Sequence, residues 1–434
     1  MKTQNSKFII NTVLIKFLFF LPIIIYSYII IKLSVNIPIW DDYESILSYL
    51  VDDIPIFSQH NEHRIAFTRI ISLISYQLTS GINFTYIIYF GNSALLVLLY
   101  YLLKQIKNTQ ISLIALLPIP YFLFQFQAWE NMTWAMASIQ NNFVVLFALL
   151  SLIYWNKKTV PCRYLAILFG IFATFTSGNG MLVLFILIIW EISIIFSSKQ
   201  TGQHKTISKY YIHSFILFSI VALIIYLYFY NYHKSAHHPN IFETLKNPFQ
   251  IIQYSGLLVG SFMKLAHPKI AFWTGILEIV LFIYLTYIKY YKKNPVIYLF
   301  MLYVFLSLAL IAISRSGIGN THAFTSRYMT LSALIPILLY ISFLDYYKKS
   351  NQIKSPIIII VFFCSLLINY FSYNKYMDAL NSRKDMLIIG VKNWNKTKDG
   401  LYYHNQKRST LLIIKSEQME IYKFPKFDPA ETQQ

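Results

Sequence analysis

The chain has 434 residues, of which 56% are hydrophobic and only 13% are charged, and its mean hydropathy is +0.50. Since about 25% of the residues in a soluble globular domain are charged, these values exclude a soluble fold and indicate a polytopic membrane protein. The formal net charge of +19 does not indicate nucleic-acid binding, because the basic residues are spread over short connections, where anionic lipid headgroups account for them.

Apolar runs in chain order predict an all-α fold with about eleven transmembrane helices. The first run, near 8–33, is too long for a signal-peptide core and lacks a small-residue cleavage site, so a retained span is expected. The other spans are expected near 84–103, 111–126, 135–155, 164–178, 180–197, 210–230, 270–289, 295–314, 328–347 and 356–373. The sequence thus predicts a transmembrane module over 1–373, followed by a tail over 374–434.

The connections between these spans predict an orientation. With a cytoplasmic N-terminus, every inner connection contains lysine, as in KQIKNTQ, NKKTVPCR and KYYKKN. The only lysine or arginine residues in the short outer connections are Arg315 and Arg327. Lysine and arginine gather in cytoplasmic loops, so the N-terminus is expected inside. The first outer loop then covers about 34–83, a second long one covers about 231–269, and the tail lies outside.

Two segments of these outer loops are predicted to be interfacial helices. RIAFTRIISLISYQLTSG (64–81) alternates apolar residues with Arg69, Ser72 and Ser75, as an interfacial helix does. If this segment were a span, every later loop would lie on the opposite side of the membrane and the lysines would be outside. NPFQIIQYSGLLVGSFMKLAHP (247–268) has a similar character.

Acidic residues gather in the first outer loop, where WDDY follows the first span within a few residues. A carboxylate at a membrane surface is partly desolvated and can serve as a general base or bind a cation. Asp41 and Asp42 are the candidate bases, with Glu62 in reserve. The alternative is a loop that is acidic only because water solvates it.

Basic and aromatic residues in other outer connections are candidate binding groups. Arg315 and Arg327 suit a phosphate or pyrophosphate, because guanidinium binds such oxyanions bidentately, although snorkelling to lipid headgroups is the alternative. Tyr328 follows Arg327 and is grouped with it. Glu130 lies between two tryptophans in FQAWENMTWAM, a pattern shared by sugar sites and by interfacial aromatic belts.

No metal site or cofactor is predicted. His60 and His63 are three residues apart, and His237 and His238 are adjacent, but no HExxH or cysteine–histidine pattern is present. There is also no P-loop and no dinucleotide-binding glycine motif.

The layout resembles the GT-C superfamily of integral membrane glycosyltransferases, in particular the bacterial type that uses polyprenyl-phosphate-linked sugars. The resemblance rests on WDDY, HNEHRI, TSRYMT and the long outer loop after the first span. It implies a donor sugar on a polyprenyl-phosphate carrier, an envelope glycan or lipid acceptor such as lipopolysaccharide or O-antigen, and a site on the outer face of the bacterial inner membrane.

The resemblance also implies roles for individual residues. Asp41 or Asp42 would be the base, Arg327 or Arg315 would bind the lipid phosphate, and Glu62, His63 and Arg64 would form a second polar layer. The chain lacks the large soluble C-terminal domain of better-known members.

Two other functions stay open: a flippase or transporter of a lipid-linked glycan, and an O-antigen polymerase or ligase. Transporters tend to place charges inside their spans. The predicted spans are nearly free of acidic residues, which favours chemistry at the surface.

Overall fold

The computed structural model describes residues 2–107, 110–200, 204–233, 244–346 and 356–426. These residues are almost wholly helical, which confirms the predicted all-α class. Strands β1 (Gln59–His60) and β2 (His63–Arg64) form one short antiparallel hairpin, in which His60 lies opposite His63.

Eight helices in the described residues are long and apolar enough to cross a bilayer. They are α1 (Lys2–Leu33), α4 (Phe84–Lys104), α8 (Ala135–Asn156), α10 (Met181–Gln200), α14 (Pro268–Tyr287), α16 (Pro295–Arg315), α17 (Met329–Tyr346) and α18 (Pro356–Thr397). α9 (Val160–Thr174) is a shorter apolar helix, and in α11 (His204–Phe229) a shorter apolar stretch covers Ser214–Phe229. The multi-pass membrane character is therefore confirmed.

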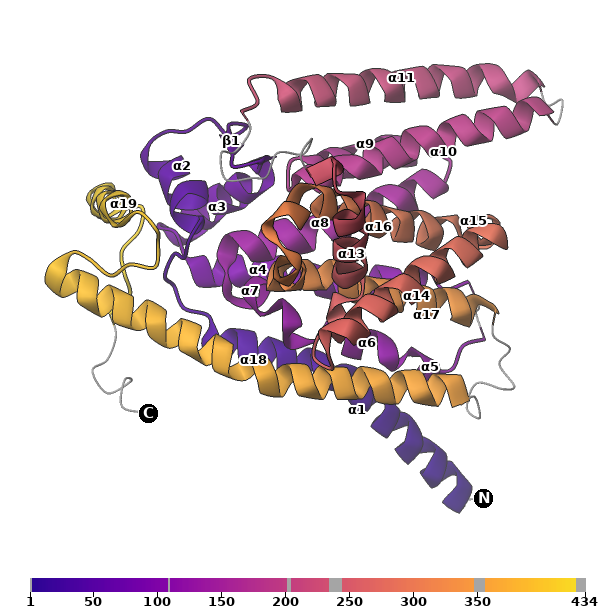
Figure 1. Cartoon of the computed structure of the whole chain (residues 1–434), viewed down its shortest axis with the longest axis horizontal. Helices are drawn as coiled ribbons and strands as arrows, with labels where there is room; N and C mark the ends of the chain where they lie inside the picture. The colour runs from indigo at the N-terminus through magenta and orange to yellow at the C-terminus, as the bar shows by residue number, and fades with distance from the viewer. Residues whose placement is uncertain (1, 108–109, 201–203, 234–243, 347–355, 427–434) are drawn as a thin grey trace.

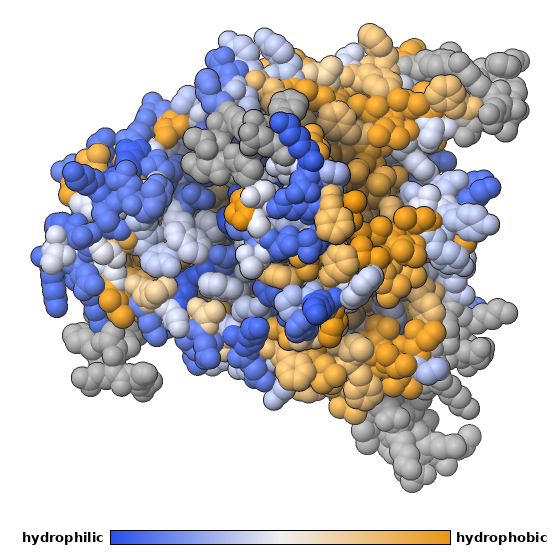
Figure 2. All heavy atoms as spheres, viewed as in Figure 1, coloured by the Kyte–Doolittle hydropathy of each residue, from blue (hydrophilic) through white to orange (hydrophobic). Residues whose placement is uncertain are grey.

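The helices separate into an apolar part and a polar end. Figure 2 shows apolar side chains over the part of the molecule that contains α14, α16 and α17, and hydrophilic side chains at the opposite end. The polar end contains α2 (Ser48–Val51), α3 (Ala66–Thr79) and α19 (Gln406–Gln418) (Figure 1). α8 lies at the centre of the bundle, with nearly all of its side chains buried.

The prediction of a continuous span at 111–126 was wrong. This segment forms α5 (Leu113–Leu116), α6 (Pro118–Leu123) and the 3-10 turn η2 (Phe126–Ala128). Pro118 and Pro120 have no backbone N–H, so they cannot donate the hydrogen bonds that a continuous helix requires.

Helix α18 runs through the expected boundary between module and tail at 373. Its 42 residues make it about 63 Å long at about 1.5 Å per residue, roughly twice the thickness of a bilayer's hydrocarbon core. It extends from the apolar part to the polar end, where α19 follows (Figure 1). The first part of the tail is thus a helix of the main fold.

The two predicted interfacial helices are present as helices. In α3 the polar residues Thr68, Arg69 and Ser72 are buried, while Leu78 is exposed, so the polar side faces inward. The second, α13 (Pro248–Val259), is shorter than the predicted segment. It ends at Val259 and is followed by Gly260, where a Cβ would lie 2.0 Å from the Ala271 carbonyl oxygen of the adjacent α14.

The expectation that the spans are nearly free of acids needs correction. Glu191 of α10 is fully buried and accepts hydrogen bonds from Arg163 Nη1 at 3.0 Å and Ser214 Oγ at 3.2 Å. Glu278, in the middle of α14, is 4% exposed. An intramembrane carboxylate is costly unless it is paired or protonated, and Arg163 supplies the pairing for Glu191.

Candidate functional site

Segments predicted separately as candidate sites meet at the polar end. Trp40 lies with its ring centroid 4.8 Å from that of Trp134. The guanidinium carbon of Arg383, from α18, lies 4.0 Å from the ring centroid of Trp129 and 5.1 Å from that of Trp40. The guanidinium carbon of Arg327 lies 5.4 Å from the ring centroid of Trp134. We call these five residues and Glu130 the tryptophan–arginine site.

Backbone contacts hold the walls of this site together. Glu130 and its neighbours form α7 (Trp129–Thr133), and Arg327 lies in the 3-10 turn η7 (Ser326–Tyr328). The Glu130 N–H donates to Ser326 Oγ at 3.0 Å, and Asn131 Nδ2 donates to the Arg327 carbonyl oxygen at 3.3 Å. The two turns are thus fixed to each other.

The charged groups of the site have unmet hydrogen-bonding capacity. The two oxygens of Glu130 lie 3.9 Å from Arg383 Nη2 and 3.9 Å from Arg327 Nε, too far for hydrogen bonds. Glu130 Oε2, Arg383 Nη2 and Arg327 Nε are buried atoms without a hydrogen-bond partner, and Arg383 as a whole is 3% exposed. Buried polar groups are costly when unpaired, so this arrangement is suited to a polar ligand.

A third cation adds to the positive charge here. Lys264 donates from Nζ to the Phe324 carbonyl oxygen at 2.9 Å. Burial lowers the pKa of Lys264 to about 8, and the charge of Lys375 lowers it further while Glu130 opposes both. Lys264, Arg327 and Arg383 surround Glu130, and the charge of Asp42 also acts on Arg383. The cations outnumber the carboxylates, which makes the region attractive to an anion.

Asp41 and Asp42 differ sharply in their surroundings. The Asp42 carboxylate is 1% exposed and accepts the N–H of Met136 at 2.9 Å and that of Ile39 at 3.2 Å. Burial raises the pKa of Asp42 to about 7, although these two N–H groups lower it. Asp41 is only partly buried, and within the described residues no hydrogen bond or ion pair holds its carboxylate. Its charge acts on Asp42 and on His60.

A second cluster contains Glu62, His63 and Arg315. Arg315 Nη2 lies 2.5 Å from Glu62 Oε1, and His63 Nε2 lies 3.7 Å from the same oxygen. His63 Nδ1 accepts the N–H of Gly178 at 3.1 Å, which ties the hairpin to the TSGNG connection. The predicted Glu62–His63 layer and the predicted Arg315 are therefore adjacent.

His322 links the two clusters. Burial and the charges of Arg315 and Arg327 lower the pKa of its imidazole, while Glu130 opposes them. The loop that carries both arginines thus borders both clusters.

Arg64 takes part in neither cluster. Its guanidinium donates to the carbonyl oxygens of Phe57 at 2.6 Å, Tyr228 at 2.6 Å and Tyr230. These contacts fasten the hairpin to the end of α11 and occupy the side chain. Tyr328 lies partly buried against the apolar core beside Arg327.

Arg383 is the residue that sequence reasoning missed, because everything after 373 was assigned to a tail. One signal was available: Leu380, Leu387 and Val391 recur at helical spacing and are buried on the side of α18 that packs inward. That periodicity predicts a continuing helix, although it does not identify Arg383 as part of a site.

Among the described residues, no group of three or more histidine, cysteine, aspartate or glutamate side chains could hold a metal ion. His237 and His238 lie outside these residues. Comparisons of the chain with models of protein families, with curated proteins and with solved structures found no match.

Proposed function

We propose that the protein is a membrane glycosyltransferase that moves a sugar from a polyprenyl-phosphate-linked donor to an envelope glycan or lipid acceptor. The observation that carries the proposal is the tryptophan–arginine site, in which Trp40 is the residue directly before Asp41 in the chain. Guanidinium groups bind phosphate oxygens, tryptophan rings offer flat apolar surfaces to a sugar, and Glu130 can accept hydrogen bonds from hydroxyl groups. Among the described residues no hydrogen bond or ion pair holds the carboxylate of Asp41, the residue that follows Trp40.

In the proposed reaction, Asp41 accepts the proton of an acceptor hydroxyl as that oxygen attacks the anomeric carbon. The bond between the anomeric carbon and the phosphate oxygen breaks, and its electron pair stays on the lipid phosphate. Arg327 and Arg383 stabilise the negative charge that develops there. Attack from the side opposite the phosphate inverts the anomeric centre. No cofactor is required.

Asp41 fits the role of base better than Asp42, for a geometric reason. A general base must reach the proton that it removes, and geometry takes precedence over pKa. A pKa near 7 would suit a base, but both oxygens of Asp42 accept backbone N–H groups in the interior. We therefore assign Asp42 the task of holding the loop to α8, and Asp41 the chemistry.

The proposal places the polar end on the outer face of the bacterial inner membrane and the N-terminus in the cytoplasm. The lysine-rich connections support this orientation, since they would then all be cytoplasmic. The partners would be the lipid-linked donor, the envelope acceptor and membrane lipids, without nucleic acid.

The proposal is tested by mass spectrometry of envelope glycans from the parent strain, a deletion strain and complemented strains. Deletion is expected to remove one sugar residue from the glycan, and wild-type protein restores it. Asp41→Asn is expected to fail, because an amide cannot take up the proton, while Asp53→Asn, an exposed carboxylate of the same loop, restores it.

Two outcomes would contradict the proposal. Loss of the whole polymer on deletion would favour a flippase, transporter, polymerase or ligase. Full restoration by Asp41→Asn, at a membrane protein level equal to that of wild type, would remove Asp41 from the reaction.

A further inference from the structure

Two uncommon backbone features flank Asp41 and Asp42. Trp40 has a φ of 46°, in the left-handed region that residues with a Cβ rarely occupy. Directly after Asp42, Tyr43–Leu47 forms the π-helix η1. Such conformations persist only where the surroundings over-determine them, and they are concentrated at functional sites. The question is which part of the molecule holds them.

The C-terminal segment supplies many of the contacts to Trp40. The Trp40 N–H donates to the Tyr402 carbonyl oxygen at 3.1 Å, and the two rings lie 5.5 Å apart. The next residue, Tyr403, stacks on Tyr43 with ring centroids 5.2 Å apart. A segment about 360 positions away in the sequence thus covers both sides of the Asp41–Asp42 pair.

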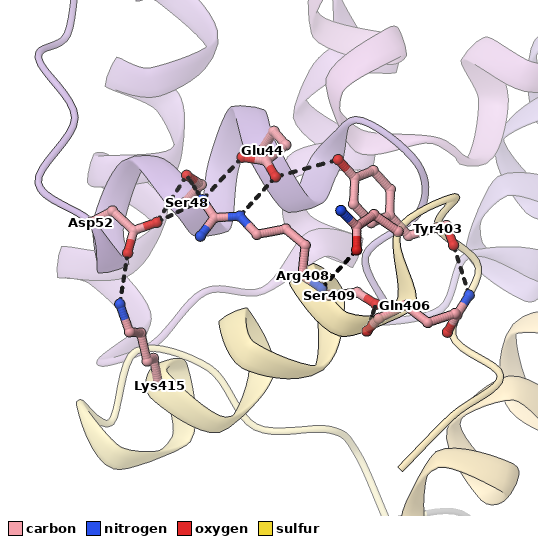
Figure 3. A network of polar contacts seen from close by, with 9 residues as sticks. Glu44, Ser48, Asp52, Tyr403, Gln406, Arg408, Ser409 and Lys415 are labelled. Carbon is pink, nitrogen blue, oxygen red and sulfur yellow. Dashed lines mark hydrogen bonds and ion pairs between the residues drawn. The ribbon is translucent and has the colours of Figure 1, made fainter.

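Arg408 fixes the π-helix itself (Figure 3). Its Nε lies 3.0 Å from Glu44 Oε1 and its Nη2 3.2 Å from Oε2, so the guanidinium binds the carboxylate through two nitrogens. The same Nη2 donates to Ser48 Oγ at 2.9 Å and to Asp52 Oδ2 at 2.8 Å. Tyr403 adds a hydroxyl donor to Glu44 Oε1 at 3.3 Å. One side chain therefore joins η1 to α2.

We propose that Tyr402, Tyr403 and Arg408, together called the C-terminal strap, are a positioning element of the active site. The strap holds Trp40 and the π-helix in place and so fixes the backbone on both sides of Asp41. Arg408 and Tyr403 are positioning residues, since they act through Trp40, Tyr43 and Glu44. The inference rests on the proposed function for the meaning of Asp41, while the mechanical link is independent of it.

A positioning role differs measurably from a purely structural one. Glu44 and Arg408 are each 29% exposed, and exposed ion pairs add little to global stability. Loss of Arg408 should therefore loosen residues 40–47 without unfolding the bundle. Lysine in its place keeps the charge but cannot reproduce the planar fork that spans Glu44 and Asp52.

The test uses the purified full-length protein and hydrogen exchange followed by mass spectrometry. In Arg408→Ala, amides of residues 40–47 are expected to exchange about tenfold faster, as befits the loss of several charge-assisted hydrogen bonds from a local opening equilibrium. Amides in the middle of α8, beyond the Met136 N–H that Asp42 binds, should be unchanged. Arg408→Lys should give an intermediate rate. Lys407→Ala removes an exposed charge from the same helix and should leave all rates at wild-type values.

Activity is measured in the same variants as the modified fraction of envelope glycan, at matched protein levels. Glycan modification is expected to fall in Arg408→Ala, to recover in part in Arg408→Lys and to persist in Lys407→Ala. If Arg408→Ala does not accumulate in the membrane, Tyr403→Phe removes just the hydroxyl bond to Glu44 and should produce a smaller change of the same kind.

Unchanged exchange over 40–47 in Arg408→Ala would overturn the strap, whatever happens to the glycan. Faster exchange with full glycan modification would also overturn it, because Asp41 would then not need the strap. Failure of the proposed function looks different: neither the deletion nor Asp41→Asn changes the glycan, while the exchange rates still report whether the strap holds the loop.

Discussion

Replacing Asp42 by asparagine is expected to change how stability depends on pH. In the folded protein the Asp42 carboxyl has a pKa of about 7, because burial disfavours the charged form more than the N–H groups of Met136 and Ile39 favour it. The ordinary value is 3.8. A group that binds its proton more tightly in the folded state stabilises that state at low pH, and this contribution is lost as pH rises from about 4 to about 7.

The size of the effect follows from the two pKa values. The difference between about 7 and 3.8 corresponds to about 4 kcal/mol of unfolding free energy between acidic and neutral pH. A chain of 434 residues with the average unfolding entropy of globular proteins loses about 1 °C of melting temperature per kcal/mol. The wild-type protein should therefore lose about 4 °C between pH 4 and pH 8 through this one group.

The measurement is the thermal unfolding midpoint of detergent-solubilised protein from pH 4 to pH 8. The difference between Asp42→Asn and wild type isolates the Asp42 contribution, since all other titrating groups are common to both proteins. The variant is expected to gain relative to wild type as pH rises, whatever its absolute stability. Asp53→Asn, an exposed control, should follow wild type at every pH. Parallel curves for Asp42→Asn and wild type would refute the buried, proton-binding state of Asp42.

Three further predictions concern arginines. Arg383→Ala should reduce glycan modification at least about tenfold, because it removes a cation from a site with unmet hydrogen bonds. The amount of protein in the membrane should change little. Glycan modification at the wild-type level would exclude Arg383 from donor binding. Arg64→Ala should lower the melting temperature by a few degrees, because it leaves three carbonyl oxygens without their donor; an unchanged melting temperature would show that these contacts are dispensable. Arg163→Ala should destabilise the protein by about 3–5 kcal/mol, since it leaves the buried Glu191 carboxylate without its cation. Adding Glu191→Gln to the same chain should restore part of the loss. If the changes in unfolding free energy of the two single variants simply add in the double variant, the pairing is contradicted.

Much of the architecture was predictable from hydropathy alone. The apolar runs identified most of the long helices, and the alternation of Arg69, Ser72 and Ser75 with apolar residues predicted α3. These signals are local, since each depends on neighbours within a few turns. Pro118 and Pro120 are an equally local signal, and they predict that 111–126 is not one continuous helix. A prediction from apolar content alone overlooks them.

The candidate site was predictable as separate parts. WDDY, Glu130 and Arg327 were each singled out from composition and spacing, but nothing in one sequence says that 40–42, 129–134 and 327 meet. The different surroundings of Asp41 and Asp42 also depend on the tertiary structure, because the N–H group that binds Asp42 belongs to Met136, more than 90 residues away.

The sequence by itself determined the membrane class, the helices and the residue types available at the polar end, because hydropathy and helical periodicity are written into neighbouring residues. Only the tertiary structure decided that α18 continues past 373, that Arg383 packs against the tryptophan rings, and that Arg408 binds the Glu44 carboxylate. Those contacts join positions hundreds of residues apart, and it is packing in space, rather than spacing along the chain, that brings such side chains together.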